Sequence, residues 1–319
     1  MWAGHRQYCE QFLVPLLLRA FFGITHNAWY RGSQEGILAI DLKRLLCWRH
    51  YLSWNVLTHI TLPSIFQGTA KDNQISLNKE SLSQVGLPLN SLRRMLKKLQ
   101  DWISHLDPLD TGKTIWMDYA KNHSYSTEET EIKKQFVMEF VQSSHLDIMW
   151  DLGCNTGDYS AAALEAGVKF VVGFDFDQGA LEKAFARVQE NHLSFQPLYM
   201  DAANPSPGQG WREQERQSLK ARANADALIA LAFIHHLAIA RNIPLEELVD
   251  WVMSLAPQGI IEFIPKQDPM VEKLLVLRED IFPDYTEAFF LAHVSSRAKI
   301  IKTIQTSKSG RLLVWYSKS

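Results

Sequence analysis

The stretch Asp151-Leu152-Gly153-Cys154-Asn155-Thr156-Gly157 decides the fold of this chain. It follows the short apolar run 148–150 and precedes a segment whose apolar residues, beginning with Tyr159, have helical spacing. A second apolar run, 170–174, ends in Asp175. Glycines allow the backbone to approach a ligand closely, and an acid at the tip of the second strand can accept both ribose hydroxyls. The pattern therefore predicts a nucleotide-binding βαβ unit.

The spacing of the glycines bears on which nucleotide binds. A dehydrogenase fingerprint, G-x-G-x-x-G, places its middle glycine against the pyrophosphate. Here Asn155 stands at that middle position between Gly153 and Gly157, and its side chain would crowd a pyrophosphate. The loop also lacks the lysine of a phosphate-binding loop. The spacing disfavours NAD and leaves room for the smaller methionine portion of S-adenosylmethionine.

Strands and helices alternate along the second part of the chain. After a helix from residue 127 or 128 to 141, we expect strands at 147–150, 170–174, 195–200, 226–232 and 258–264, and helices at 158–166, 178–190, 245–255 and 269–279. Such alternation predicts a mainly parallel sheet with helices on both faces. Two β-rich runs, 299–306 and 312–316, predict a closing hairpin that adds an antiparallel strand.

Residues 1–111 have a different pattern and are predicted to form a helical region that binds the acceptor or a partner. Apolar residues recur with helical spacing up to about residue 67 and again from Leu82 to Leu99, with a polar linker between them. The helical pattern begins almost at residue 1, so we expect a further portion upstream. Residues 112–319 are predicted to be the nucleotide-binding domain.

The composition limits the class of protein. Of the 319 residues, 46% are hydrophobic and 21% charged, and the net charge is -2, so no overall field attracts nucleic acid or anionic membrane. The three cysteines are isolated, which argues against disulfides and against a cysteine-rich zinc site. The apolar run from Phe12 to Gly23 is shorter than the roughly 20 residues of a membrane-spanning helix. We expect a cytoplasmic protein with no membrane partner; oligomeric state is left open.

Several stretches in this order resemble the class I S-adenosylmethionine-dependent methyltransferases, in particular a group related to the nodulation methyltransferases. They are DLGCNTGDYS (151–160), VVGFDFD (171–177), LYMDAANPSPGQGW (198–211), ADALIALAFIHHL (225–237), IIEFIPKQDPM (260–270) and the closing hairpin. The resemblance covers about residues 115–319. It implies a Rossmann-like α/β fold of the class I methyltransferase type and S-adenosyl-L-methionine as the cofactor.

The resemblance also implies roles for residues at matching positions. Asp151 and the 153–157 loop would surround the methionine part, Asp175 would hold the ribose hydroxyls, and Asp201 would reach the adenine amino group. Asp177 is expected to cap a helix rather than bind the cofactor. The expected cofactor-binding residues are Tyr119, Tyr125, Asp151, Gly153, Cys154, Asn155, Gly157, Asp175, Phe176, Asp201 and Ala202.

A histidine pair is the candidate for proton transfer. The fourth strand is expected to end at His235 and His236, where ligands of open α/β sheets lie. A histidine there could take the proton that an oxygen or nitrogen nucleophile loses. His235 is favoured over His236, with Glu262 as a further catalytic candidate; the alternative is that the histidines shape the turn. A metal held by the three is possible in principle, but their spacing does not enforce convergence, so no metal is predicted.

The charged insert 211–222 has two interpretations. A solvated helix with Glu–Arg pairs is favoured, and the alternative is a clamp of Arg212, Arg216 and Arg222 for an anionic acceptor. The sequence thus predicts a methyltransferase that acts on an oxygen or nitrogen of an unidentified acceptor, in the first place a small molecule. The alternatives are a non-catalytic adapter with a nucleotide fold, an RNA-modifying methyltransferase with a His/Glu metal site, and an NAD-dependent dehydrogenase.

Overall fold

The computed structural model describes residues 4–27, 29–32, 34–65, 88–109, 127–276 and 279–318. The chain divides into two units, Met1–Gly112 and Lys113–Ser319. Each unit has its own hydrophobic core.

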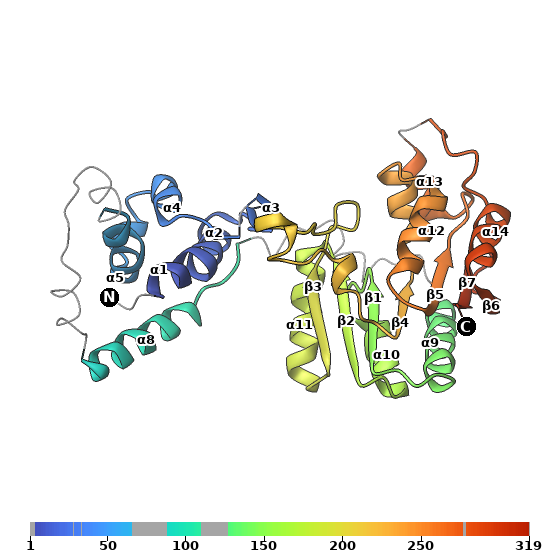
Figure 1. Ribbon diagram of the computed structural model, residues 1–319, viewed down its shortest axis with the longest axis horizontal. Coiled ribbons are helices and arrows are strands. Elements are labelled where there is room, and N and C mark those ends of the chain that lie inside the picture. The colour runs from blue at the N-terminus through green and yellow to red at the C-terminus, as the bar shows by residue number, and fades with distance from the viewer. Residues whose placement is uncertain are drawn as a thin grey trace. The chain divides into compact units, whose positions relative to one another are not determined.

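The second unit is built on a seven-stranded sheet (Figure 1). Its strands are β1 (Ile148–Leu152), β2 (Phe170–Asp175), β3 (Phe195–Tyr199), β4 (Ala227–Ala230), β5 (Gln258–Phe263), β6 (Lys299–Gln305) and β7 (Leu312–Ser317). They lie in the order β3-β2-β1-β4-β5-β7-β6. Strands β1 to β5 are parallel, and β7 runs antiparallel to both β5 and β6. This topology confirms the predicted fold class, including the closing hairpin.

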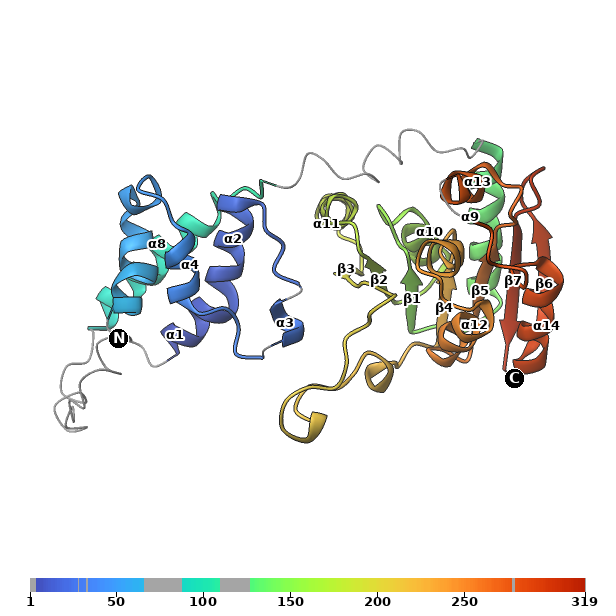
Figure 2. The same cartoon turned by 90° about the horizontal axis from the view of Figure 1, so that it is seen from above.

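Helices cover both faces of this sheet (Figures 1 and 2). The helices are α9 (Thr127–Gln142), α10 (Asp158–Ala166), α11 (Gln178–Asn191), α12 (Leu245–Ser254), α13 (Pro269–Leu275) and α14 (Glu287–Arg297). Successive residues of a strand point to opposite faces. Met149 of β1 accordingly packs in a core with residues of α9, α10 and α11, whereas Trp150 packs in a second core with residues of α12, α13 and α14.

Two local predictions for this unit were wrong, and one helix was missed. The insert does not form one helix. A bridge between Gln209 and Arg216 encloses the 3-10 turn η4 (Trp211–Glu213), and a second 3-10 turn, η5 (Lys220–Arg222), follows it. Arg212 and Glu213 have left-handed φ angles of 58° and 60°, which stop helix propagation. Strand β4 ends at Ala230, before the histidine pair, and helix α14 was not predicted at all.

The first unit is helical. Its described elements are α1 (His5–Tyr8), the π-helical turn η1 (Cys9–Leu13), α2 (Val14–Phe22), α3 (Trp29–Gly32), α4 (Ala39–Leu45), the 3-10 turn η2 (His50–Leu52), α5 (Trp54–Val56), the π-helical turn η3 (Leu57–Thr61) and α8 (Leu89–Ile103). The apolar run that begins at Phe12 buries Leu13, Val14, Leu17 and Leu18 in the core of this unit. No helix within the described ranges is long and apolar enough to cross a membrane. The predicted polar linker lies outside these ranges.

Polar side chains are also buried in this unit. His5, Cys9 and His59 are each 2% exposed. Burial lowers the pKa of His5 and, to about 4, that of His59, so both rings are neutral near pH 7. Burial also raises the pKa of the Cys9 thiol to about 12.

Candidate functional site

A cavity of about 290 Å³ lies beyond the carboxyl ends of the parallel strands. The loop after β1, the tips of β2 and β3, and the segment after β4 all contribute to its wall. Apolar side chains including Phe174, Met200, Leu231 and Leu237 make up much of the lining, and Asp175 and Asp201 add carboxylates. Ligands of open α/β sheets bind at this edge, and a mainly apolar pocket with a few polar groups is typical of small-molecule sites.

The glycine loop is tied to the neighbouring strand. The backbone N–H groups of Gly153 and Cys154 donate to the Phe174 carbonyl at 2.8 and 3.0 Å. Gly153 and Gly157 both have φ of 80°, which disfavours any residue with a side chain. A Cβ at Gly157 would also lie 2.5 Å from the Phe195 ring. These constraints hold the loop backbone beside the tip of β2.

Asp175 is fixed at the tip of β2 by backbone donors. Its Oδ2 accepts a hydrogen bond from the Asn155 N–H at 2.9 Å, and its Oδ1 accepts one from the Asp177 N–H at 2.9 Å. Burial raises the pKa of this carboxyl, and hydrogen bonds from the backbone of Asp177, Asn155 and Phe176 oppose the shift. A carboxylate has about four lone-pair sites, so Asp175 can accept from a further donor. Two immobilised acceptors on a cavity wall suit the vicinal hydroxyls of a ribose.

The neighbouring acids differ in role. Asp201 lines the cavity, and its Oδ1 accepts from the Ala203 N–H at 3.1 Å. Asp177 is 5% exposed and caps α11, accepting from the Ala180 N–H at 3.0 Å. Phe176 also lines the cavity and is 50% exposed. Its ring gives this part of the wall a flat apolar surface.

The predicted cofactor-binding residues fall into three groups. Those that line the cavity are Gly153, Cys154, Asn155, Asp175, Phe176, Asp201 and Ala202. Gly157 and Asp151 lie behind the wall, where Asp151 accepts a 2.6 Å hydrogen bond from the Ser160 hydroxyl. Burial raises the pKa of Asp151 to about 7. Tyr119 and Tyr125 lie outside the described residues.

The histidine pair lies at a π-helical turn, η6 (His236–Ala240), rather than on a strand. His236 lines the cavity, whereas the favoured His235 is fully buried and does not. The two ring centroids are 4.0 Å apart. Burial lowers the pKa of His236 to about 4, so its ring is neutral at pH 7. Neither ring nitrogen of His235 has a hydrogen-bond partner among the described residues.

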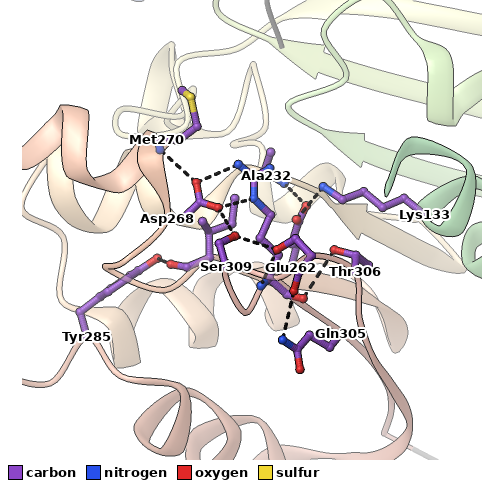
Figure 3. Close-up of polar contacts among 12 residues, drawn as sticks. Lys133, Ala232, Glu262, Asp268, Met270, Tyr285, Gln305, Thr306 and Ser309 are labelled. Carbon is purple, nitrogen blue, oxygen red and sulfur yellow. Dashed lines mark hydrogen bonds and ion pairs between the residues drawn. The ribbon is translucent and has the colours of Figure 1, made fainter. Parts of the chain in front are cut away.

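Glu262 is fully buried on β5 and does not line the cavity. Figure 3 shows its contacts with Lys133 and Ala232. The Lys133 ammonium of α9 lies 2.6 Å from its Oε1. Its Oε2 accepts a hydrogen bond from the Ala232 N–H at 2.8 Å, and Ala232 has a left-handed φ of 49°. Glu262 therefore fixes the backbone of the cavity wall. Within the described chain, the two histidines and Glu262 do not bring their ligand atoms together as a metal site requires.

A second buried ion pair, between Asp268 and Arg311, joins the segment after β5 to the start of β7. The contacts of Asp268 are drawn in Figure 3. Asp268 caps α13 and accepts from the Arg311 guanidinium at 2.6 and 2.8 Å. Ser309 donates to the same carboxylate at 2.6 Å. Lys266, by contrast, bonds with Asp280 at 2.7 Å. Lys266 and Asp268 are therefore engaged in structural contacts.

Some cavity residues gave no signal in the sequence. Thr130 and Lys133 come from α9, and Arg241 and Leu274 from segments after β4 and β5. Their positions follow from packing between distant segments, and none belongs to a motif. The insert arginines are not on the wall; Arg216 and Arg222 donate instead to Gln209 at 3.1 Å and Ser206 at 2.9 Å.

Comparison with known proteins gives two kinds of relative. The nodulation protein NoeA of Rhizobium meliloti (strain 1021) is 47% identical over 320 residues, which cover 100% of this chain and 67% of NoeA. The ribosomal protein L11 methyltransferase of Colwellia psychrerythraea (strain 34H) is 26% identical over 36% of this chain and 47% of its own length. No family model matches.

Solved structures give weaker matches. Magnesium protoporphyrin IX methyltransferase from Synechocystis PCC 6803, solved with bound S-adenosylmethionine, is 19% identical with a TM-score of 0.40. The match covers 65% of this chain and 86% of that structure.

Proposed function

Because this chain belongs to the family of the nodulation protein NoeA and is an S-adenosylmethionine-dependent methyltransferase, we propose that it methylates an oxygen or nitrogen atom of a small-molecule acceptor. The observation that carries the proposal is the cavity, in which the β1 loop, the tip of β2 and the tip of β3 meet. Because the relative NoeA is named a nodulation protein, the proposal includes a role for this methylation in nodulation.

The cavity residues fit the cofactor in a definite order. The 153–156 backbone would bind the methionine part, the two fixed oxygens of Asp175 would accept the ribose hydroxyls, and Asp201 would accept from the adenine amino group. Phe176 would pack on the adenine. When bound, the cofactor supplies a methyl group on a positively charged sulfur. The residues that hold it would promote transfer by keeping nucleophile and methyl in line.

His236 is the proposed base for the acceptor. Its ring lines the cavity and is neutral at pH 7, so a ring nitrogen can take the proton that the nucleophile loses. Its lowered pKa makes His236 a weak base. It would therefore assist only those acceptors whose nucleophile releases its proton easily. His235 and Glu262 would act indirectly, by packing and by fixing the backbone at Ala232.

Calorimetric titration with S-adenosylhomocysteine tests the cofactor site. Asp175→Asn should weaken binding about 10- to 150-fold, because a hydrogen bond to a charged group contributes about 1.5–3 kcal/mol. The matched control is Asp147→Asn, since Asp147 is an exposed acid before β1 that pairs with Lys169. Failure of the wild-type chain to bind, or equal weakening in both variants, would contradict the proposed site.

The acceptor class needs a separate measurement. When the enzyme and radiolabelled cofactor are mixed with each candidate acceptor in turn, the labelled methyl group should appear in a small-molecule extract and not in ribosomal protein or RNA. His236→Gln should lower kcat with less effect on cofactor binding. Label incorporated into ribosomal protein would instead support the acceptor named for the L11 methyltransferase relatives.

A further inference from the structure

Three potential metal ligands, His5, Cys9 and His59, lie close together inside the first unit. The proposed methyl transfer does not use them. The Nε2 atom of His5 lies 2.9 Å from Nδ1 of His59 and 3.7 Å from the Cys9 sulfur. One ligand atom from each residue lies within 4.8 Å of the others, and all three side chains are buried. The cluster joins segments 54 residues apart in the sequence.

The two separations that involve His5 are close to those of a tetrahedral site. With zinc–nitrogen bonds of about 2.0–2.1 Å and zinc–sulfur bonds of about 2.3 Å, tetrahedral angles place sulfur and nitrogen about 3.6 Å apart and two nitrogens about 3.3 Å apart. The observed sulfur–nitrogen distance of 3.7 Å matches the first value. The nitrogen–nitrogen distance of 2.9 Å requires the rings to separate by a few tenths of an ångström. The Cys9 sulfur and a ring nitrogen of His59 lie within 4.8 Å of each other. Side-chain rotations that adjust these three separations would admit a cation.

The local backbone is the second observation. His5 and Cys9 are four residues apart and share one helical face. Cys9 begins the π-helical turn η1, and His59 lies in the π-helical turn η3. Single π-helical turns are rare and often occur at functional sites. In this cluster, two such turns bring their ligand-type residues to one point.

We propose that His5, Cys9 and His59 bind one divalent transition-metal cation of the zinc class. One thiolate and two imidazoles suit zinc, cobalt or copper and do not suit magnesium or calcium, which prefer oxygen ligands. Binding displaces the thiol proton to solvent and forms one metal–sulfur bond and two metal–nitrogen bonds. Three protein ligands leave the fourth tetrahedral position for water or another donor. The cation links α1 and η1 to η3.

Cobalt(II) is the probe because it replaces zinc and absorbs light. The full chain, stripped with a chelator and kept reduced, should bind one cobalt per chain and develop a thiolate-to-cobalt band in the near ultraviolet together with visible bands of four-coordinate cobalt. Zinc should displace the cobalt and abolish both the near-ultraviolet band and the visible bands. Cys9→Ser should lose the near-ultraviolet band, and His59→Gln should weaken cobalt binding at least tenfold.

Cys47 gives a matched control. It also lies near a histidine, with its sulfur 3.4 Å from Nδ1 of His50, but it is exposed. Cys47→Ser should keep the full spectrum. A chain with both Cys47→Ser and Cys154→Ser retains Cys9 as its one cysteine, and it should keep the spectrum too.

The double variant keeps the test decisive even where Cys9→Ser does not fold. A wild-type chain without the thiolate band, or loss of the band in the double variant, would overturn the proposal. In that case the three residues form a metal-free hydrogen-bonded cluster. Circular dichroism of each variant separates loss of a ligand from loss of the fold.

Discussion

The two units bury polar side chains in different ways. The second unit pairs opposite charges, Lys133 with Glu262 and Arg311 with Asp268. The first gathers two neutral imidazoles and a thiol. A buried ion pair is costly to break, because removal of one partner leaves a desolvated charge. Neutral ligand-type groups carry no such penalty and remain available to a cation. The Lys133–Glu262 pair of the second unit thus fixes the backbone of a site, whereas the His5–Cys9–His59 cluster of the first assembles a set of ligands.

The largest expected effect comes from breaking the Lys133–Glu262 pair. Glu262→Gln keeps the volume and an acceptor for the Ala232 N–H but removes the negative charge that lies 2.6 Å from the buried Lys133 ammonium. We expect the free energy of unfolding to fall by about 3–5 kcal/mol. Denaturant titration followed by circular dichroism measures the change.

An exposed pair in the same unit is the control. Glu139 and Lys302 lie 2.6 Å apart with side chains 52% and 42% exposed, so Glu139→Gln should cost at most about 1 kcal/mol. Adding Lys133→Met to Glu262→Gln should recover part of the loss, because the buried positive charge is then removed as well. Equal losses in both single variants would remove the distinction between the pairs.

The sequence predicted the fold of the second unit closely because its signals are local. Glycine turns, alternating periodicity and acids at strand tips place most strands and helices within two residues of their observed ends. Helix α14 was missed because Phe289, Phe290 and Leu291 form a short apolar run without clear helical spacing. The insert failed as a helix because its Glu–Arg spacing says nothing of the left-handed φ angles at Arg212 and Glu213.

The sites were less predictable because they depend on contacts between distant segments. The loop residues and Asp175 were identifiable from a contiguous motif. The pairing of Lys133 with Glu262 joins α9 to β5, and no local pattern encodes it. The pair was expected at the end of a strand, with His235 favoured, whereas the histidines lie at a π-helical turn and His236 is the one that lines the cavity. The His5–Cys9–His59 cluster likewise joins residues that are 54 positions apart in the sequence.

A smaller effect should appear on acidification. Burial, followed by the charges of His236, Arg311 and Lys133, lowers the pKa of His235 well below its ordinary value, and burial lowers that of His236 to about 4. Both histidines are protonated more readily when unfolded, so their contribution to stability is full above about pH 6.5 and falls as the pH drops below it. Each contributes a loss of up to about 1.4 kcal/mol per pH unit.

Denaturant titrations at pH 7.5 and 5.5 measure this dependence. His235→Leu should reduce the difference in unfolding free energy between the two pH values. His145→Asn, at an exposed histidine before β1, should leave the difference unchanged. An unchanged difference in His235→Leu would show that His235 is not the source of the acid sensitivity.

The smallest expected effect separates two neighbouring acids at the tip of β2. Asp177→Ala removes the N-cap of α11 and should cost about 1 kcal/mol of unfolding free energy. Thr286→Ala, at the N-cap of α14, is the matched control and should cost a similar amount. Neither variant should change the affinity for S-adenosylhomocysteine, because the N–H of residue 177 that donates to Asp175 is retained in Asp177→Ala. If Asp177→Ala weakened that binding as much as Asp175→Asn, Asp177 would be a cofactor ligand as well as a cap.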